Sequence, residues 1–125
     1  LSGAAAAAVL VLGVVMLMPQ APAPVIATLA AEDKTLAFEA SYADGELTVT
    51  RVAGTPAPAG QVHELWIIAP DTAPVSLGLL ADAPLTVAAA KPPTGWVLAV
   101  SLEPAGGSTT GAPTGPVLMT AEIGI

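Results

Sequence analysis

Residues 96–120 read WVLAVSLEPAGGSTTGAPTGPVLMT and combine two apolar runs with one long polar connection. The apolar runs, residues 96–102 and 117–119, have the composition of β-strands. Residues 103–116 between them are rich in Gly, Pro, Ser and Thr, which favour turns and loops. The stretch therefore predicts two strands joined by a wide loop, and this loop is the most distinctive feature of the sequence.

A tight hairpin is predicted earlier in the chain, where apolar and polar residues alternate on both sides of Asp44-Gly45. Asp-Gly suits a type I′ turn, because both central positions of that turn need a positive φ. The side chains expected to face the core are Leu36, Phe38, Ala40, Tyr42, Leu47 and Val49.

Further short strands are predicted over residues 25–29, 61–68, 75–80 and 85–89, with Gly78 at a bulge. The segment QVHELWII at residues 61–68 is apolar on both faces, which is typical of a central strand. The chain thus contains seven or eight short strands separated by turn-rich segments, and no amphipathic helix. This pattern predicts an all-β fold, an antiparallel β-sandwich.

The composition restricts the classes of partner and chemistry. The chain has 125 residues, a formal net charge of −7 and three basic residues, Lys34, Arg51 and Lys91. It lacks the basic patch that neutralises phosphates, which argues against binding of nucleic acid. Cysteine is absent, and this removes disulfides, thiolate metal sites and cysteine nucleophiles.

The N-terminal residues 1–18, LSGAAAAAVLVLGVVMLM, carry no charged side chain and are followed by Pro19. As a helix they would be about 27 Å long, close to the thickness of the hydrocarbon core of a bilayer. We therefore expect a transmembrane helix over residues 1–18. The alternatives are a signal peptide, with a small-x-small cleavage site at residues 21–23, and a buried helix of a soluble protein.

The residues that follow divide into a linker and a domain. Residues 19–34 are expected to form a juxtamembrane linker rich in Pro and Ala, which can include a first strand, and residues 35–125 the β-sandwich domain. Because extended, weakly packed backbone is accessible to proteases, residues 20–34 are the segment expected to be cut. The chain begins with Leu1 rather than Met, so we expect it to be part of a longer protein.

Catalytic and metal-binding patterns are not found. His63 is the only histidine, and the adjacent Glu64 points to the opposite face of the same strand. We interpret His63 as a partly buried histidine with a local hydrogen bond, since one His without Cys excludes a blue-copper site. None of Ser76, Ser101 and Ser108 lies in a G-x-S-x-G motif, and the ten acidic residues show no paired spacing. We therefore predict no catalytic, metal or cofactor site and do not expect an enzyme.

The aromatic residues and the long loop leave interpretations open. Trp66 and Trp96 are typical of core packing, although they could form a sugar-stacking platform. The run AGGSTTG at residues 105–111 suggests a phosphate-binding loop, but no Lys and no helix follow it.

The loop is then either a structural hairpin connection, with glycines at positive φ, or a contact surface for a partner. We expect it to be ordered and held by its prolines and by hydrogen bonds from Ser108, Thr110 and Thr114. The candidate contact or structural residues are Glu103, Gly106, Gly107, Ser108, Thr110, Gly111, Pro113, Thr114, Gly115 and Pro116.

Two segments resemble a known family. HELWIIAPDTAPVSLGLL at residues 63–80 and LAVSLEPAGGSTTGAPTGPVL at residues 98–118 are similar to the two signature blocks of the anti-sigma-K factor C-terminal domain, the RskA-like family. The second block is long and unusual in composition, and the resemblance covers nearly all of the chain after Met18. At Thr109 the family often has Pro.

The resemblance implies a single-pass protein of the bacterial inner membrane, with the residues after about 19 extracytoplasmic. It implies a cytoplasmic segment, missing from this chain, that binds an extracytoplasmic-function sigma factor, and membrane-associated proteases that release this factor. The expected partners are thus that sigma factor, these proteases and the lipid bilayer, and no nucleic acid. Whether the missing segment binds zinc stays open. The alternative is a secreted or membrane-anchored β-sandwich that binds a ligand such as a glycan through Trp66, Trp96 or the long loop.

Overall fold

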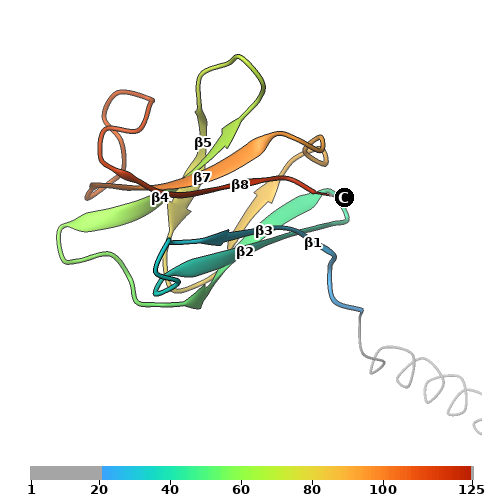
Figure 1. The fold of residues 1–125 in the computed structure, drawn as a ribbon, viewed down its shortest axis with the longest axis horizontal. Coiled ribbons are helices and arrows are strands. Elements are labelled where there is room, and N and C mark those ends of the chain that lie inside the picture. The colour runs from blue at the N-terminus through green and yellow to red at the C-terminus, as the bar shows by residue number, and fades with distance from the viewer. Residues whose placement is uncertain (1–20, 125) are drawn as a thin grey trace, which may run out of the picture.

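The computed structural model describes residues 21–124, which form two antiparallel four-stranded sheets (Figure 1). The first sheet has the strand order β1-β2-β3-β6 and the second the order β5-β4-β7-β8. The predicted all-β fold is therefore confirmed. The strands are β1 (Val25–Ala30), β2 (Ala37–Ala43), β3 (Glu46–Ala53), β4 (Gln61–Ile68), β5 (Val75–Leu80), β6 (Leu85–Ala88), β7 (Val97–Pro104) and β8 (Val117–Glu122).

The predicted transmembrane helix over residues 1–18 lies outside the described residues. Within residues 21–124 no helix is long and apolar enough to cross a membrane.

The core lies between the two sheets and follows from the alternation in the sequence. The predicted inward residues of β2 and β3 are buried or half-buried, and Phe38 and Leu47 are each 1% exposed. Aliphatic side chains of β4 and β7 meet them from the second sheet. Burial of each large apolar side chain stabilises the fold by about 1.5–3 kcal/mol. The fully buried apolar residues of this core are Leu29, Phe38, Ala40, Leu47, Val49, Leu65, Leu98, Val100 and Ile123.

Two predicted turn features are present. Asp44 and Gly45 have φ angles of 53° and 78°, as a type I′ turn requires, and Ala43 pairs with Glu46 across the turn. The register of β4 against β5 shifts near Gly78, whose φ is 137°. This irregularity is the bulge that a glycine inside an apolar strand predicts.

The possible first strand within residues 19–34 is present. Residues 25–30 form strand β1 at the edge of the first sheet, paired with β2, so this part of the segment is not weakly packed. Leu29 is completely buried, and the backbone N–H of Gly124 donates a hydrogen bond of 2.8 Å to the carbonyl oxygen of Ile26. The folded unit therefore begins at Val25. Before it, residues 21–24 are the described part without strand structure, and three of the four are exposed.

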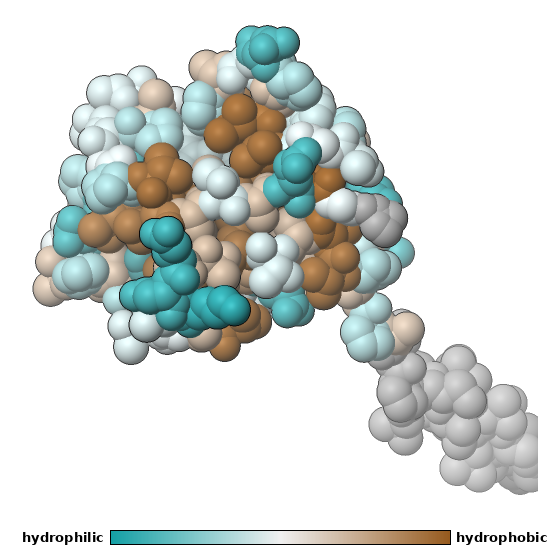
Figure 2. Space-filling view, in the orientation of Figure 1, coloured by the Kyte–Doolittle hydropathy of each residue, from teal (hydrophilic) through white to brown (hydrophobic). Residues whose placement is uncertain are grey.

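The two ends of the sandwich carry different features. The chain enters β1 beside the β2–β3 turn, because Tyr42 N donates to Pro24 O at 3.1 Å, and the C-terminal end of the chain lies at this end too (Figure 1). The long loop between β7 and β8 lies at the opposite end (Figure 1). On the face shown in Figure 2, strongly hydrophilic residues gather over the β1–β2 connection, and apolar residues form several separate patches. This face therefore carries no single continuous apolar surface.

Candidate functional site

Two buried glutamates anchor the long loop, and both lie on the outer face of the second sheet. Glu64 on β4 pairs with Ser101 on β7, and Val62 pairs with Glu103. His63, between Val62 and Glu64, points the other way, into the sandwich. Its ring packs edge-to-face against Phe38, with 5.9 Å between ring centroids. His63 and Glu64 thus lie on opposite faces of β4, as the alternation predicts.

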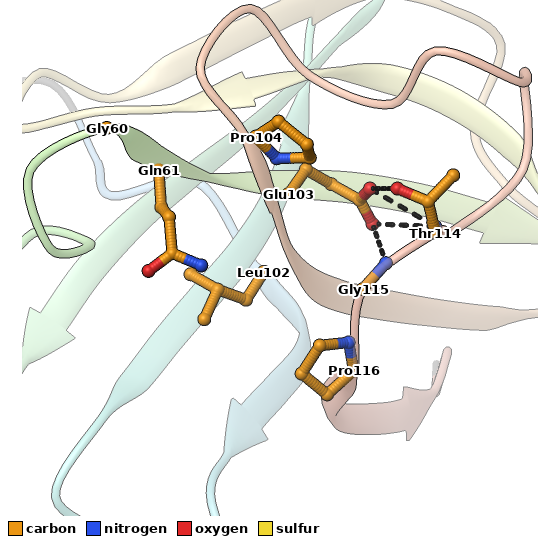
Figure 3. Close-up of a pocket in the computed structure, with 8 residues that line it drawn as sticks. All are labelled: Gly60, Gln61, Leu102, Glu103, Pro104, Thr114, Gly115 and Pro116. Carbon is orange, nitrogen blue, oxygen red and sulfur yellow. Dashed lines mark hydrogen bonds between the residues drawn. The ribbon is translucent and has the colours of Figure 1, made fainter.

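Glu103 is completely buried and holds the C-terminal end of the loop (Figure 3). Its carboxylate accepts hydrogen bonds from the backbone N–H of Thr114 at 3.1 Å and from that of Gly115 at 3.3 Å. The hydroxyl of Thr114 donates a third bond to Oε1, and the hydroxyl of Ser101 a fourth to Oε2, at 2.6 Å. Both carboxylate oxygens therefore accept hydrogen bonds, and the donors come from β7 and from the loop.

The environment of Glu103 favours its charged form. Burial raises the pKa of this carboxyl, but the hydrogen bonds from Ser101, Thr114 and Gly115 outweigh burial and hold the pKa below its usual value. Hydrogen bonds to a charged acceptor are about twice as strong as those between neutral groups. The negative charge thus fastens the loop to β7.

Ser101 links Glu103 to Trp66. The indole Nε1–H of Trp66 donates to Ser101 Oγ at 2.9 Å, and the same hydroxyl donates to Glu103. Trp66 is completely buried, so its indole is part of this hydrogen-bonded chain and cannot stack on a sugar. The interpretation of Trp66 as a packing residue is confirmed. The alternative prediction, a sugar-stacking platform formed by Trp66 and Trp96, is wrong.

Glu64 holds the N-terminal part of the loop. Its carboxylate accepts hydrogen bonds from the backbone N–H of Ser108 at 2.7 Å and from the hydroxyl of Ser76 at 2.5 Å. Gly107 precedes Ser108 with a φ of 96°, and a Cβ there would lie 3.0 Å from Glu64 Oε1 and 3.0 Å from Leu79. A glycine is therefore needed for the loop to approach Glu64.

The loop is also bonded within itself. The hydroxyls of Ser108 and Thr110 both donate to the carbonyl oxygen of Ala112, the latter at 3.0 Å. Together with Thr114 on Glu103, these bonds confirm the three hydroxyl residues predicted to hold the loop. Gly115 passes so close to β7 that a Cβ would lie 1.7 Å from the carbonyl oxygen of Leu102.

The ten predicted loop residues have different roles. Six of them bind the loop to the second sheet, allow its close approach or bond it internally: Glu103, Gly107, Ser108, Thr110, Thr114 and Gly115. Gly106 and Gly111 have positive φ in open space, and Pro116 accepts a hydrogen bond from Leu102 N at 3.0 Å. Pro113 is half-buried and forms no hydrogen bond in the part of the chain that the structure describes.

Sequence reasoning missed Glu64, Ser76, Trp66 and Ser101 as partners of the loop. The available signal was an acidic residue inside an otherwise apolar central strand, since a buried carboxylate must find hydrogen-bond partners. Its partners are far away in the sequence, and only the strand pairing brings them together.

His63 is 5% exposed. The predicted local hydrogen bond is not among those of the described residues; the contact with Phe38 takes its place. Burial, and secondarily the charge of Arg51, lower the pKa of His63 below its usual value. The imidazole is therefore neutral at neutral pH. No group of three His, Cys, Asp or Glu that could hold a metal occurs among residues 21–124.

The distinctive site of this small sandwich is therefore the long loop, which is bound to the second sheet through Glu64 and Glu103. Each carboxylate oxygen of these two residues accepts a hydrogen bond from within the chain. The family described as "Anti-sigma-K factor rskA, C-terminal" matches residues 1–117. The chain therefore belongs to this family, and the resemblance seen in residues 63–80 and 98–118 is confirmed. Comparison with curated proteins and with solved structures finds no match.

Membership identifies the chain as a domain of an anti-sigma factor and implies a sigma factor as the partner of the protein. Proteins of this family are generally associated with a membrane. The signature blocks coincide with the anchored site, because one contains Glu64 and Ser76 and the other Ser101, Glu103, Ser108 and Thr114.

Proposed function

We propose that the sandwich is the extracytoplasmic regulatory domain of a single-pass anti-sigma factor in the bacterial inner membrane. In this proposal residues 1–18 span the bilayer, and a missing cytoplasmic segment binds an extracytoplasmic-function sigma factor. Membrane-associated proteases cut the chain and free this sigma factor. The role is regulatory and not enzymatic.

The observation that carries the proposal is the position of β1. This strand follows the apolar N-terminal stretch after only a few residues. It pairs with β2 along one edge, and Ile26 on its other edge accepts a hydrogen bond from Gly124 N. Proteases bind extended, accessible backbone, and paired backbone is protected from them. While β1 is docked, two described parts of residues 20–34 are free of strand structure: residues 21–24 before β1 and residues 31–34 after it. Of these two parts, only residues 21–24 lie between the N-terminal stretch and the sandwich.

Docking of β1 thus controls how much chain a protease can reach near the membrane. Release of the strand exposes the apolar side chains of Ile26 and Leu29, which are 4% and 0% exposed in the sandwich. The free energy of that exposure sets the resistance to cleavage. A signal that weakens the docking of β1 raises the rate of cleavage and the release of the sigma factor.

The test is a cell with a reporter gene that depends on the sigma factor and the full-length protein carrying Leu29→Ala. This change removes buried contacts from β1 and is expected to cost about 2–5 kcal/mol of stability. We expect more cleavage on immunoblots and higher reporter output. The exposed neighbour Thr28→Ala on the same strand is the matched control and should leave both unchanged.

A second control separates release of β1 from general unfolding. Val100→Ala removes buried contacts from β7 in the other sheet. If it raises cleavage as much as Leu29→Ala at equal loss of stability, global unfolding controls cleavage and β1 does not. Unchanged cleavage in both variants contradicts the proposed function itself.

The topology has its own test because the chain has no cysteine. A single cysteine at the exposed Thr94 should react with a membrane-impermeant maleimide in intact cells whose outer membrane has been permeabilised. Labelling only after lysis of the inner membrane would place the sandwich in the cytoplasm and refute the extracytoplasmic assignment.

A further inference from the structure

An apolar cavity of about 380 Å³ opens at the end of the sandwich where the chain enters β1. Leu47 on β3, Ile67 on β4 and Leu77 on β5 form its inner walls, so both sheets contribute. The half-buried indole of Trp96 and residues 89–93 complete it. The long loop lies at the other end of the sandwich and takes no part.

The wall formed by residues 89–96 is held in place by the fold. The phenol of Tyr42 donates to Ala89 O at 2.7 Å, and Ala89 N donates to Gly45 O at 3.0 Å. Trp96 N donates to Pro93 O at 3.2 Å, and Pro92 is buried. Small-molecule sites are usually preformed, and a preformed pocket favours binding because the protein loses little conformational entropy when the ligand binds.

The lining defines the chemistry of the ligand. Almost all of the exposed lining is apolar, which suits a hydrocarbon chain, and Lys91 is the single charged residue in it. No acidic residue lines the cavity, and within residues 21–124 Lys91 forms no ion pair. The ammonium is therefore available to a carboxylate. Ligand cavities span about 300–1,000 Å³, so this one suits a single short chain and not a two-chain lipid.

We propose that this cavity binds a free medium-chain fatty acid, with the hydrocarbon chain against Trp96 and Leu77 and the carboxylate paired with Lys91. The site is separate from the anchored loop and goes beyond the regulation of cleavage proposed above. It gives the domain a way to respond to a small molecule.

The experiment uses residues 21–125, which contain both complete sheets and their core, after circular dichroism and cooperative thermal unfolding have verified the fold. The probe is decanoate carrying a terminal bromine, used below its micelle concentration, because bromine quenches indole fluorescence on contact. Trp96 lines the cavity, whereas Trp66 is completely buried and bonded to Ser101. We therefore expect saturable quenching that Trp96→Phe abolishes.

Two variants test the lining. Ala90→Leu fills the cavity from an exposed position and should remove the saturable quenching while the melting temperature is unchanged. Lys91→Gln should weaken binding of decanoate about two- to five-fold, as expected for a solvent-accessible ion pair, and leave binding of the uncharged decanol unaltered. Binding of decanoate should also raise the melting temperature of the unaltered protein.

Three results would overturn the assignment. The first is quenching that does not saturate, or that persists in Trp96→Phe and Ala90→Leu. The second is an equal effect of Lys91→Gln on decanoate and decanol. The third is binding to phosphatidylglycerol vesicles without binding of free decanoate, which would make this end of the sandwich a membrane-contact surface.

Discussion

Replacement of Glu103 by Gln tests the anchored loop most directly, because Gln keeps the shape of the side chain and removes its charge. Glu103 accepts four hydrogen-bond donors from Ser101, Thr114 and Gly115. The amide NH2 replaces one acceptor oxygen, so at least one of these donors faces another donor in a buried site. An unsatisfied buried group costs about 1–3 kcal/mol, and the remaining bonds lose their charge assistance.

We therefore expect Glu103→Gln to lower the free energy of unfolding by about 2–4 kcal/mol, a large part of the roughly 5–15 kcal/mol typical of a domain. The assay is urea denaturation of the purified domain at neutral pH, in a Trp96→Phe background so that the fluorescence comes from Trp66, whose indole is bonded to Ser101. Glu122→Gln, at an exposed position of β8, is the control and should change stability by less than about 0.5 kcal/mol.

The pH dependence adds a second measurement. The folded pKa of Glu103 is lowered, so its contribution is complete above the ordinary pKa of 4.5 and is lost as the pH falls through the lower folded value. The difference in stability between the unaltered protein and Glu103→Gln should shrink over this range. A difference below about 1 kcal/mol at neutral pH, or one that does not change on acidification, would refute the role assigned to this charge.

Three further predictions follow from the site and the core. Gly115→Ala should prevent the loop from approaching β7 and lower stability by at least about 3 kcal/mol, since its Cβ would lie 1.7 Å from Leu102 O. The control Gly111→Ala, at a φ of 79° in open space, should lower stability by only about 1–2 kcal/mol. Equal losses of stability in thermal denaturation would contradict the close approach of Gly115. Ser101→Ala should destabilise the domain by about 1–3 kcal/mol and alter the emission of Trp66, because both Trp66 and Glu103 lose a partner; an unchanged spectrum would argue against the bonded chain. In the folded protein the pKa of His63 lies below its ordinary value of 6.5, so the stability of the domain should decrease as the pH falls below 6.5. His63→Gln should flatten this part of the plot of stability against pH. An identical plot for the variant would show that another group is responsible.

Local patterns predicted much of the first sheet. Apolar and polar residues alternate along β2 and β3, and this alternation predicts which side chains face the core. Asp44-Gly45 favours one turn geometry, which sets the register of the two strands. The strand at residues 25–29 was also recognised. Its burial does not follow from the local pattern, because Ile26 and Leu29 are covered by core side chains from distant strands of both sheets.

The candidate loop was recognised from composition, and the three hydroxyl residues that hold it were predicted from their type. Its anchors were not all found. Glu103 lies next to the loop in the sequence, but Glu64 is 44 positions away from Ser108, and no local pattern pairs them. The cavity at Trp96 cannot be predicted from a local pattern either, since its walls come from three strands and a proline-rich segment.

The class of fold and the family can be predicted from the amino-acid sequence, because alternation, turn residues and the two signature blocks are properties of short segments. The role of the signature residues emerges from long-range contacts in the folded chain. Pairing of β4 with β7 places Glu64, Trp66, Ser101 and Glu103 on one face, where the long loop folds back on them. A buried carboxylate is stable only where hydrogen-bond donors converge on it, and in this chain those donors come from segments far apart in the sequence.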